Sequence, residues 1–280
     1  MLLVTGTQEN DYNVLFKDKE RRRIRRAVRS FALGLETESS PGPSSFLRRV
    51  AGTFASPAPT FENIARHPRF FAPFLASLIL FAGFWGVVYL KLGWSGMAVA
   101  VVQNFRRGTL VTQGEIDFTL QFSRVVGPAV LIGGASAILI HLLIISWLGA
   151  RLAALLLGAG LRLRVALSLA CWAYLAKSIA QMILGLPMVL FGGINGLNFG
   201  NLLPTNIAFF LDPKDMPRIV YALLQSLDFI QLWYFALLGI GFSTHSDDPG
   251  SPRVMAVILA ALWIVWNVFF AAFRDVFFGS

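Results

Sequence analysis

Val126–Gly149 reads VGPAVLIGGASAILIHLLIISWLG, a stretch whose only ionisable side chain is His141. A helix needs about 20 mainly apolar residues to cross the hydrocarbon core of a bilayer, and this stretch provides them. The whole chain has the same character, because 56% of its 280 residues are hydrophobic and only 14% are charged. Soluble domains carry about 25% charged residues. The sequence therefore predicts an all-α, polytopic integral membrane protein.

Four other apolar stretches have a comparable length. Each is long enough to span a bilayer as a helix, and polar or charged segments separate them. These stretches are Phe70–Leu90, Val165–Phe191, Ile219–Phe242 and Val254–Phe273. Together with Val126–Gly149 they predict a bundle of five transmembrane helices within residues 70–275.

The first 45 residues differ in composition from the rest of the chain. KDKERRRIRRAVRS (residues 17–30) is a basic block, and ETESSPGPSS (residues 36–45) has the composition of a linker. We therefore predict that residues 1–45 form a disordered basic tail and linker. Two roles for the block stay open: a solvated tail that fixes orientation, and a contact of Lys17–Arg29 with anionic lipid headgroups. Nucleic-acid binding is not expected, because no fold signature or aromatic interleaving accompanies the charge.

Residues 46–69 connect this tail to the first predicted span. Phe61, Ile64 and Ala65 follow the i, i+3, i+4 spacing that places apolar side chains on one face of a helix. Pro68 ends or bends that helix. This pattern predicts a short amphipathic helix at the membrane surface, just before the first span.

The distribution of cations predicts an orientation. Twelve of the 24 Lys and Arg residues lie within residues 1–69, and cytoplasmic segments are rich in these residues. We therefore expect a cytoplasmic N-terminus and, with five spans, a C-terminus on the opposite side. The remaining cations run partly against this rule, so the prediction depends on the N-terminal block. Arg outnumbers Lys by 19 to 5, which is typical of a GC-rich genome and favours a bacterial inner membrane.

Two ionisable residues inside the predicted spans need an explanation. Asp228 lies in QSLDFIQLWYF (residues 225–235), and Lys177 lies in CWAYLAKSIAQM (residues 171–182). Spans three and four run antiparallel, so the flexible Lys177 side chain could reach Asp228. A structural pair that fixes helix packing is one interpretation. The alternatives are a polar pathway for a substrate or for protons, and an Asp228 that stays hydrated near a loop. Further polar residues that could line such a pathway are His141, Gln181 and Gln225.

No constellation of residues typical of catalysis is present in the sequence. The three histidines are scattered, the single cysteine is Cys171, and no cluster has metal-ligand spacing. We therefore predict no catalytic, cofactor-binding or metal site, and a protein that is not an enzyme.

Three motifs resemble the Yip domain, a family of five-span membrane proteins whose eukaryotic members interact with Rab GTPases. SPAPTFENIARHPRFFAP (residues 56–73) resembles the opening of that domain, LDFIQLWYFALLGIGFS (residues 227–243) resembles its fourth span, and LPTNIAFFLD (residues 203–212) resembles the segment before that span in bacterial members. The resemblance covers about residues 54–275. Its motif positions here are Pro57, Phe61, Pro68, Asn206, Asp228, Trp233, Gly239 and Gly241.

What the resemblance implies is an all-helical domain with a cytoplasmic N-terminus and no catalytic residues. Eukaryotic relatives are linked to vesicle trafficking and membrane shaping, but a bacterial member has no Rab partner. We therefore expect a non-enzymatic protein that organises the membrane or acts as a scaffold, with the lipid bilayer, other membrane proteins or a second copy of itself as partners. The alternative is a small transporter or channel with a polar route at Lys177 and Asp228.

Overall fold

The computed structural model describes residues 45–106, 113–158, 160–191, 203–212, 215–246, 248 and 250–278. Contacts between residues divide the chain into two units, Met1–Ser44 and Ser45–Ser280, and the description below concerns the second unit. The predictions made for the basic tail, including the lipid contact of Lys17–Arg29, lie outside the described residues.

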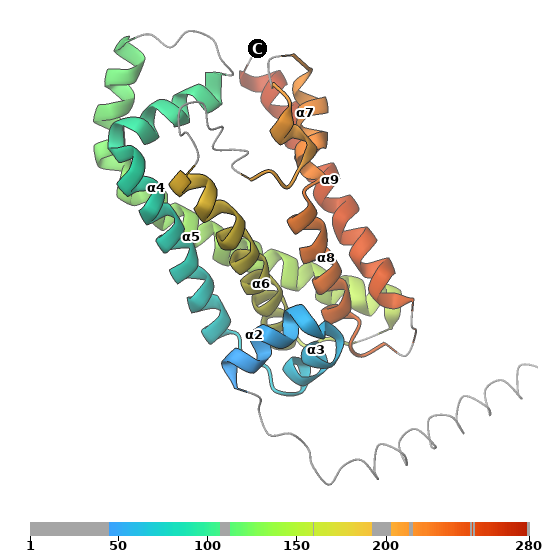
Figure 1. The fold of residues 1–280 in the computed structure, drawn as a ribbon. Coiled ribbons are helices and arrows are strands. Elements are labelled where there is room, and N and C mark those ends of the chain that lie inside the picture. The colour runs from blue at the N-terminus through green and yellow to red at the C-terminus, as the bar shows by residue number, and fades with distance from the viewer. Residues whose placement is uncertain are drawn as a thin grey trace, which may run out of the picture. The chain divides into compact units, whose positions relative to one another are not determined.

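Four long helices form the frame of the described unit (Figure 1). They are α4 (Phe71–Arg106), α5 (Gln113–Leu157), α6 (Leu163–Phe191) and α9 (Ser251–Phe278). Each contains a stretch that is long and apolar enough to cross a membrane: Phe71–Gly93, Gly133–Leu157, Leu163–Phe191 and Ser251–Phe273. Four of the five predicted spans are therefore confirmed as long apolar helices.

The described part of the connection between the first two spans is largely helical. α4 bends at Gly93, whose φ of 63° lies in the left-handed region that glycine adopts at little cost. The helix then continues to Arg106, and α5 already begins at Gln113. The described residues of this connection are therefore mostly extensions of the two neighbouring helices.

The predicted fourth span, Ile219–Phe242, is not one continuous helix. It consists of α7 (Arg218–Ser226) and α8 (Phe229–Phe242), with Leu227 and Asp228 between them. The prediction of an uninterrupted helix was wrong because Asp228 has extended backbone angles (φ −88°, ψ 125°) and caps α8. Aspartate is one of the residues preferred at this position.

Residues 46–69 form two short helices rather than one. α2 (Phe46–Ala55) and α3 (Pro57–Arg66) lie beside the lower ends of α6 and α8 (Figure 1). Phe61 is fully buried, and its ring lies next to the backbone of Gly241 in α8. The apolar face predicted for this segment exists, but it packs against other helices of the protein instead of facing lipid. Its placement at the membrane surface stays a prediction.

The core of the unit lies around the first half of α6. Three small residues at helical spacing on α6, Ala166, Ala170 and Ala173, are all fully buried. They allow neighbouring helices to approach closely, as small residues do between membrane helices. α8 likewise approaches α9 closely at Gly239, where a Cβ atom would lie only 2.9 Å from the Cβ of Ala256.

Candidate functional site

The break between α7 and α8 is stabilised by a segment that is remote in sequence. Asp228 pairs with Asn206 in an isolated antiparallel bridge, and the backbone N–H of Phe229 donates to the carbonyl of Thr205 at 2.8 Å. Asn206 is buried and caps η3 (Ile207–Phe210), accepting a hydrogen bond from the N–H of Phe209 at 3.0 Å. This segment therefore satisfies backbone groups that the interrupted helix leaves open.

Both carboxylate oxygens of Asp228 accept hydrogen bonds from the protein. Oδ1 accepts from the backbone N–H of Gln231 at 2.8 Å, which is the N-cap bond of α8. Oδ2 accepts from the hydroxyl of Thr205 at 2.5 Å. Hydrogen bonds to a charged group are stronger than neutral ones. Asp228 is thus the point at which α8 and the segment before α7 are joined.

Lys177 on α6 reaches the same junction from the other side. Its ammonium group donates to Oε1 of Gln231 at 2.6 Å. It also lies 5.5 Å from the ring centroid of Tyr174 and 5.2 Å from that of Tyr234, within the range of a cation–π interaction. The charge of Lys177 is therefore surrounded by an amide oxygen and two aromatic faces.

The predicted pair of Lys177 and Asp228 is thus linked through Gln231. Gln231 accepts from Lys177 with its side chain and donates to Asp228 with its backbone. The hydrogen bond of Lys177 goes to this glutamine and not to Asp228, so direct pairing stays a prediction. Gln231 was assigned no role in the sequence analysis. A usable signal was present, because an N-cap residue followed three positions later by Glu or Gln marks a helix start.

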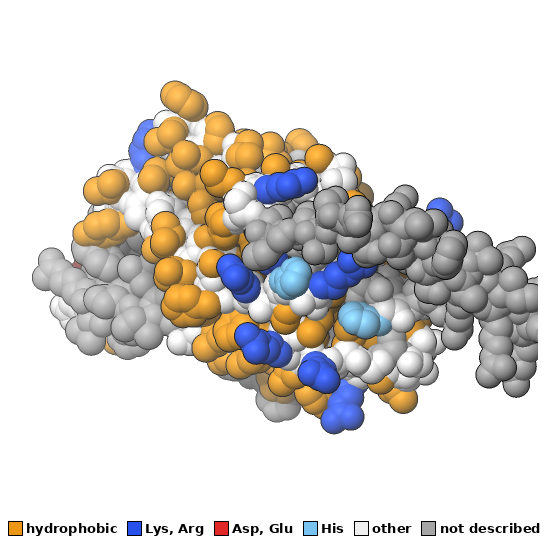
Figure 2. Space-filling model, turned by 90° about the horizontal axis from the view of Figure 1, so that it is seen from below, with side chains coloured by type: hydrophobic (Ala, Val, Ile, Leu, Met, Phe, Trp, Pro, Cys, Tyr) orange, Lys and Arg blue, Asp and Glu red, His pale blue; other side chains and the backbone are white. Residues whose placement is uncertain are grey.

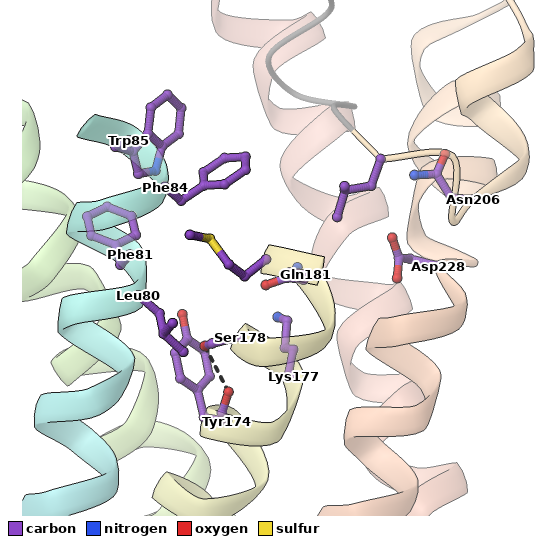
Figure 3. Close-up of a pocket in the computed structure, with 12 residues that line it drawn as sticks. Leu80, Phe81, Phe84, Trp85, Tyr174, Lys177, Ser178, Gln181, Asn206 and Asp228 are labelled. Atoms are coloured by element: carbon purple, nitrogen blue, oxygen red, sulfur yellow. Dashed lines mark hydrogen bonds between the residues drawn. The ribbon is translucent and has the colours of Figure 1, made fainter. Parts of the chain in front are cut away.

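A cavity of about 380 Å³ lies beside this junction (Figure 3). Polar side chains line one side of it, and the apolar and aromatic side chains of α4 line the other. The lining residues are Leu80, Phe81, Phe84, Trp85, Tyr174, Lys177, Ser178, Gln181, Met182, Leu203, Asn206 and Asp228. The Asp228 carboxylate faces α6 across the cavity (Figure 3), so both predicted charges border the same space.

Beyond Tyr174 the next turns of the helices are tightly packed. Leu169, Ala170 and Ala173 on α6 and Tyr234 on α8 have no exposed surface. Within the part of the chain that the structure describes, the cavity therefore ends at Tyr174 and does not continue toward α3.

The three residues predicted to line a polar route lie in different parts of the structure. Gln181 borders the cavity. His141 on α5 is outside the cavity lining, and its Nε2 lies 3.3 Å from the hydroxyl of Tyr234. Gln225 lies on α7, also outside the lining. Of the predicted polar set, Gln181, Lys177 and Asp228 therefore border the cavity.

The remaining motif positions lie at helix starts and helix contacts. Pro57 is the first residue of α3, and Pro68 follows its end. Trp233 on α8 packs against Phe54 of α2, with ring centroids 5.3 Å apart. With Phe61 against Gly241, these contacts attach the α2–α3 pair to α8. Among the described residues, no group of three or more His, Cys, Asp or Glu side chains is placed to hold a metal ion.

Comparison with protein families finds a match. A family model described as the Yip1 domain matches residues 51–273. These limits include α3, all the long apolar stretches and the cavity. Neither the comparison with curated proteins nor the comparison with solved structures finds a match.

Proposed function

Because the chain belongs to the Yip1 domain family, we propose that it is a non-enzymatic multi-pass membrane protein that organises the membrane or holds other membrane proteins together. The observation that carries this proposal is that the polar groups of Asp228 and Lys177 form hydrogen bonds within the protein. Both oxygens of Asp228 and the ammonium of Lys177 make hydrogen bonds that join α6, α8 and the segment before α7. Groups engaged in this way stabilise one arrangement of helices.

Transport is the less favoured role. A transporter needs a polar route that reaches both faces of the membrane, with ionisable residues along it. The cavity here ends at Tyr174, and the fully buried residues Ala170 and Ala173 follow. This shape suits a binding pocket or a structural cavity better than a pathway.

For the topology, we propose that α7 and α8 together make a fifth crossing. α8 has 14 residues and is therefore about 21 Å long, which is less than the roughly 30 Å of a hydrocarbon core. α7 supplies the missing length. Non-helical backbone at membrane depth is tolerated where it is buried in protein, and the Asn206–Asp228 bridge provides such cover.

The charge distribution supports a cytoplasmic N-terminus and a C-terminus on the opposite side. Seven arginines have exposed side chains at the helix ends next to α2 and α3, a face on which Arg and Lys gather in Figure 2. They are Arg48, Arg66, Arg69, Arg151, Arg162, Arg164 and Arg253. Such an excess is typical of cytoplasmic loops. We place the protein in a bacterial inner membrane, with Lys17–Arg29 as a further contact to anionic headgroups and a second copy or other membrane proteins as partners.

Reconstitution into liposomes would test the proposed role. Vesicles with an entrapped pH-sensitive dye report proton flux, and electron cryomicroscopy reports vesicle size and clustering at rising protein-to-lipid ratios. We expect flux equal to that of empty vesicles, together with a dose-dependent change in vesicle shape or clustering. A flux that disappears in Lys177→Met but persists in Lys91→Met, an exposed lysine outside the cavity, would instead establish the transporter.

A further inference from the structure

The cavity contains two opposite charges, each with hydrogen-bonding capacity left over. The Lys177 ammonium has three donors, and one hydrogen bond, to Gln231, is present. The Asp228 carboxylate can accept about four hydrogen bonds, and two are present, from Gln231 and Thr205. The carboxylate faces α6 across the cavity (Figure 3). A ligand with one negative and one positive group would complement both sides.

We propose that this cavity binds the zwitterionic headgroup of a phospholipid, with the phosphate beside Lys177 and the ammonium group beside Asp228. Charged side chains inside a membrane are costly, and they are usually paired with other polar or charged groups. A zwitterion neutralises both without adding net charge. An anionic headgroup would satisfy Lys177 but place a second negative charge near Asp228. This inference does not depend on the role proposed above.

Further polar groups near Lys177 suit a phosphate. Gln181, one turn beyond Lys177 on α6, brings a side-chain amide to the cavity wall. Its N–H groups can donate to a phosphate oxygen. The hydroxyl of Ser178 borders the same space. The phosphate side of the site therefore has an amide donor in addition to the ammonium group, and Gln231, which holds Lys177 in place, lies outside the lining.

The opposite wall explains why a lipid fits better than a free zwitterion. Leu80, Phe81, Phe84 and Trp85 of α4 line this wall of the cavity, and they belong to the apolar stretch Phe71–Gly93. The cavity volume of about 380 Å³ falls within the range of small-molecule sites. A headgroup alone leaves this apolar wall uncovered, whereas the glycerol and first acyl carbons of a lipid would cover it.

Binding can be measured with the purified full-length chain in a non-ionic, lipid-free detergent. The probes are short-chain phosphatidylethanolamine, short-chain phosphatidylglycerol and free phosphoethanolamine, with thermal shift and native mass spectrometry as readouts. We expect phosphatidylethanolamine to bind at least about tenfold more tightly than phosphatidylglycerol, a difference of about 1.4 kcal/mol. Equal affinity for the two lipids would overturn the proposal. Equal affinity for free phosphoethanolamine would overturn the assignment to a lipid.

Three variants and one control locate the site. Asp228→Asn keeps an acceptor for the α8 cap but removes the charge, so the preference for phosphatidylethanolamine should disappear. Lys177→Met should weaken binding of both lipids. Ser178→Phe fills the cavity without changing any charge, and it keeps the test decisive if the charge variants fold poorly. Lys91→Met should bind as the wild type does. Unchanged lipid preference in a folded Asp228→Asn or Ser178→Phe protein would refute the site.

Discussion

Replacing Asp228 by alanine should destabilise the protein far more than replacing it by asparagine. Alanine removes two acceptors at once, the cap of α8 and the partner of the Thr205 hydroxyl. Loss of an N-cap costs about 0.5–2 kcal/mol, and loss of a hydrogen bond to a charged group costs about 1.5–3 kcal/mol. The expected loss for Asp228→Ala is therefore about 2–5 kcal/mol.

Asparagine keeps the geometry of the junction while removing the charge. Its carbonyl oxygen can accept from the N–H of Gln231, and its amide can donate to the Thr205 hydroxyl, which can also act as an acceptor. Asn and Asp are about equally good N-caps. We expect Asp228→Asn to cost less than about 1 kcal/mol on that basis.

The free energy of unfolding of both variants can be measured by titration with sodium dodecyl sulfate in mixed micelles, with tryptophan fluorescence as the signal. Trp233, one of the seven tryptophans of the chain, lies in the first two turns of α8, so part of this signal reports on the helix that Asp228 caps. Equal losses for alanine and asparagine would mean that charge, and not the cap, stabilises the junction. No loss for alanine would mean that the helix break is stable without Asp228.

Three further experiments test the packing and the polar network. Gly239→Ala should cost about 1–3 kcal/mol of stability through overpacking against α9. Its control, Gly83→Ala, has open space around it and should be neutral or gain up to about 1 kcal/mol. Equal thermal stability of the two variants would contradict the close approach of α8 to α9. In a double-mutant cycle of Lys177→Met and Gln231→Leu, the loss of unfolding free energy in the double variant should be about 0.5–3 kcal/mol smaller than the sum of the two single losses. Simple additivity would show that the two residues are uncoupled. Trp172→Phe removes the donor to a backbone carbonyl that lies between α3 and α4 and should cost about 1 kcal/mol, measured as a lower midpoint of thermal unfolding; an unchanged midpoint would show that this bond adds no stability.

Hydropathy predicted the long helices because a helix that crosses a bilayer needs about 20 consecutive, mainly apolar residues. The same averaging hid the break at Asp228, since the apolar residues of α7 and α8 read as one continuous stretch. Only the capping pattern of Asp228 and Gln231 distinguishes the two cases. The apolar spacing of Phe61 and Ile64 correctly indicated a helix face, but the partner of that face, Gly241 on α8, is nearly 180 residues away and leaves no local signal.

The places of Asp228, Gln231 and Lys177 along the chain have a consequence for biogenesis. Domains form from the N-terminus onward during synthesis, so α6 enters the membrane before α8 exists. Lys177 then lacks its hydrogen-bond acceptor until Gln231 has been synthesised, more than fifty residues later. The hydroxyl donor to Asp228, Thr205, is by contrast already present when Asp228 is added. A nascent chain that stalls before Gln231 therefore carries the Lys177 cation without this acceptor, and it also lacks the bond that joins α6 to α8.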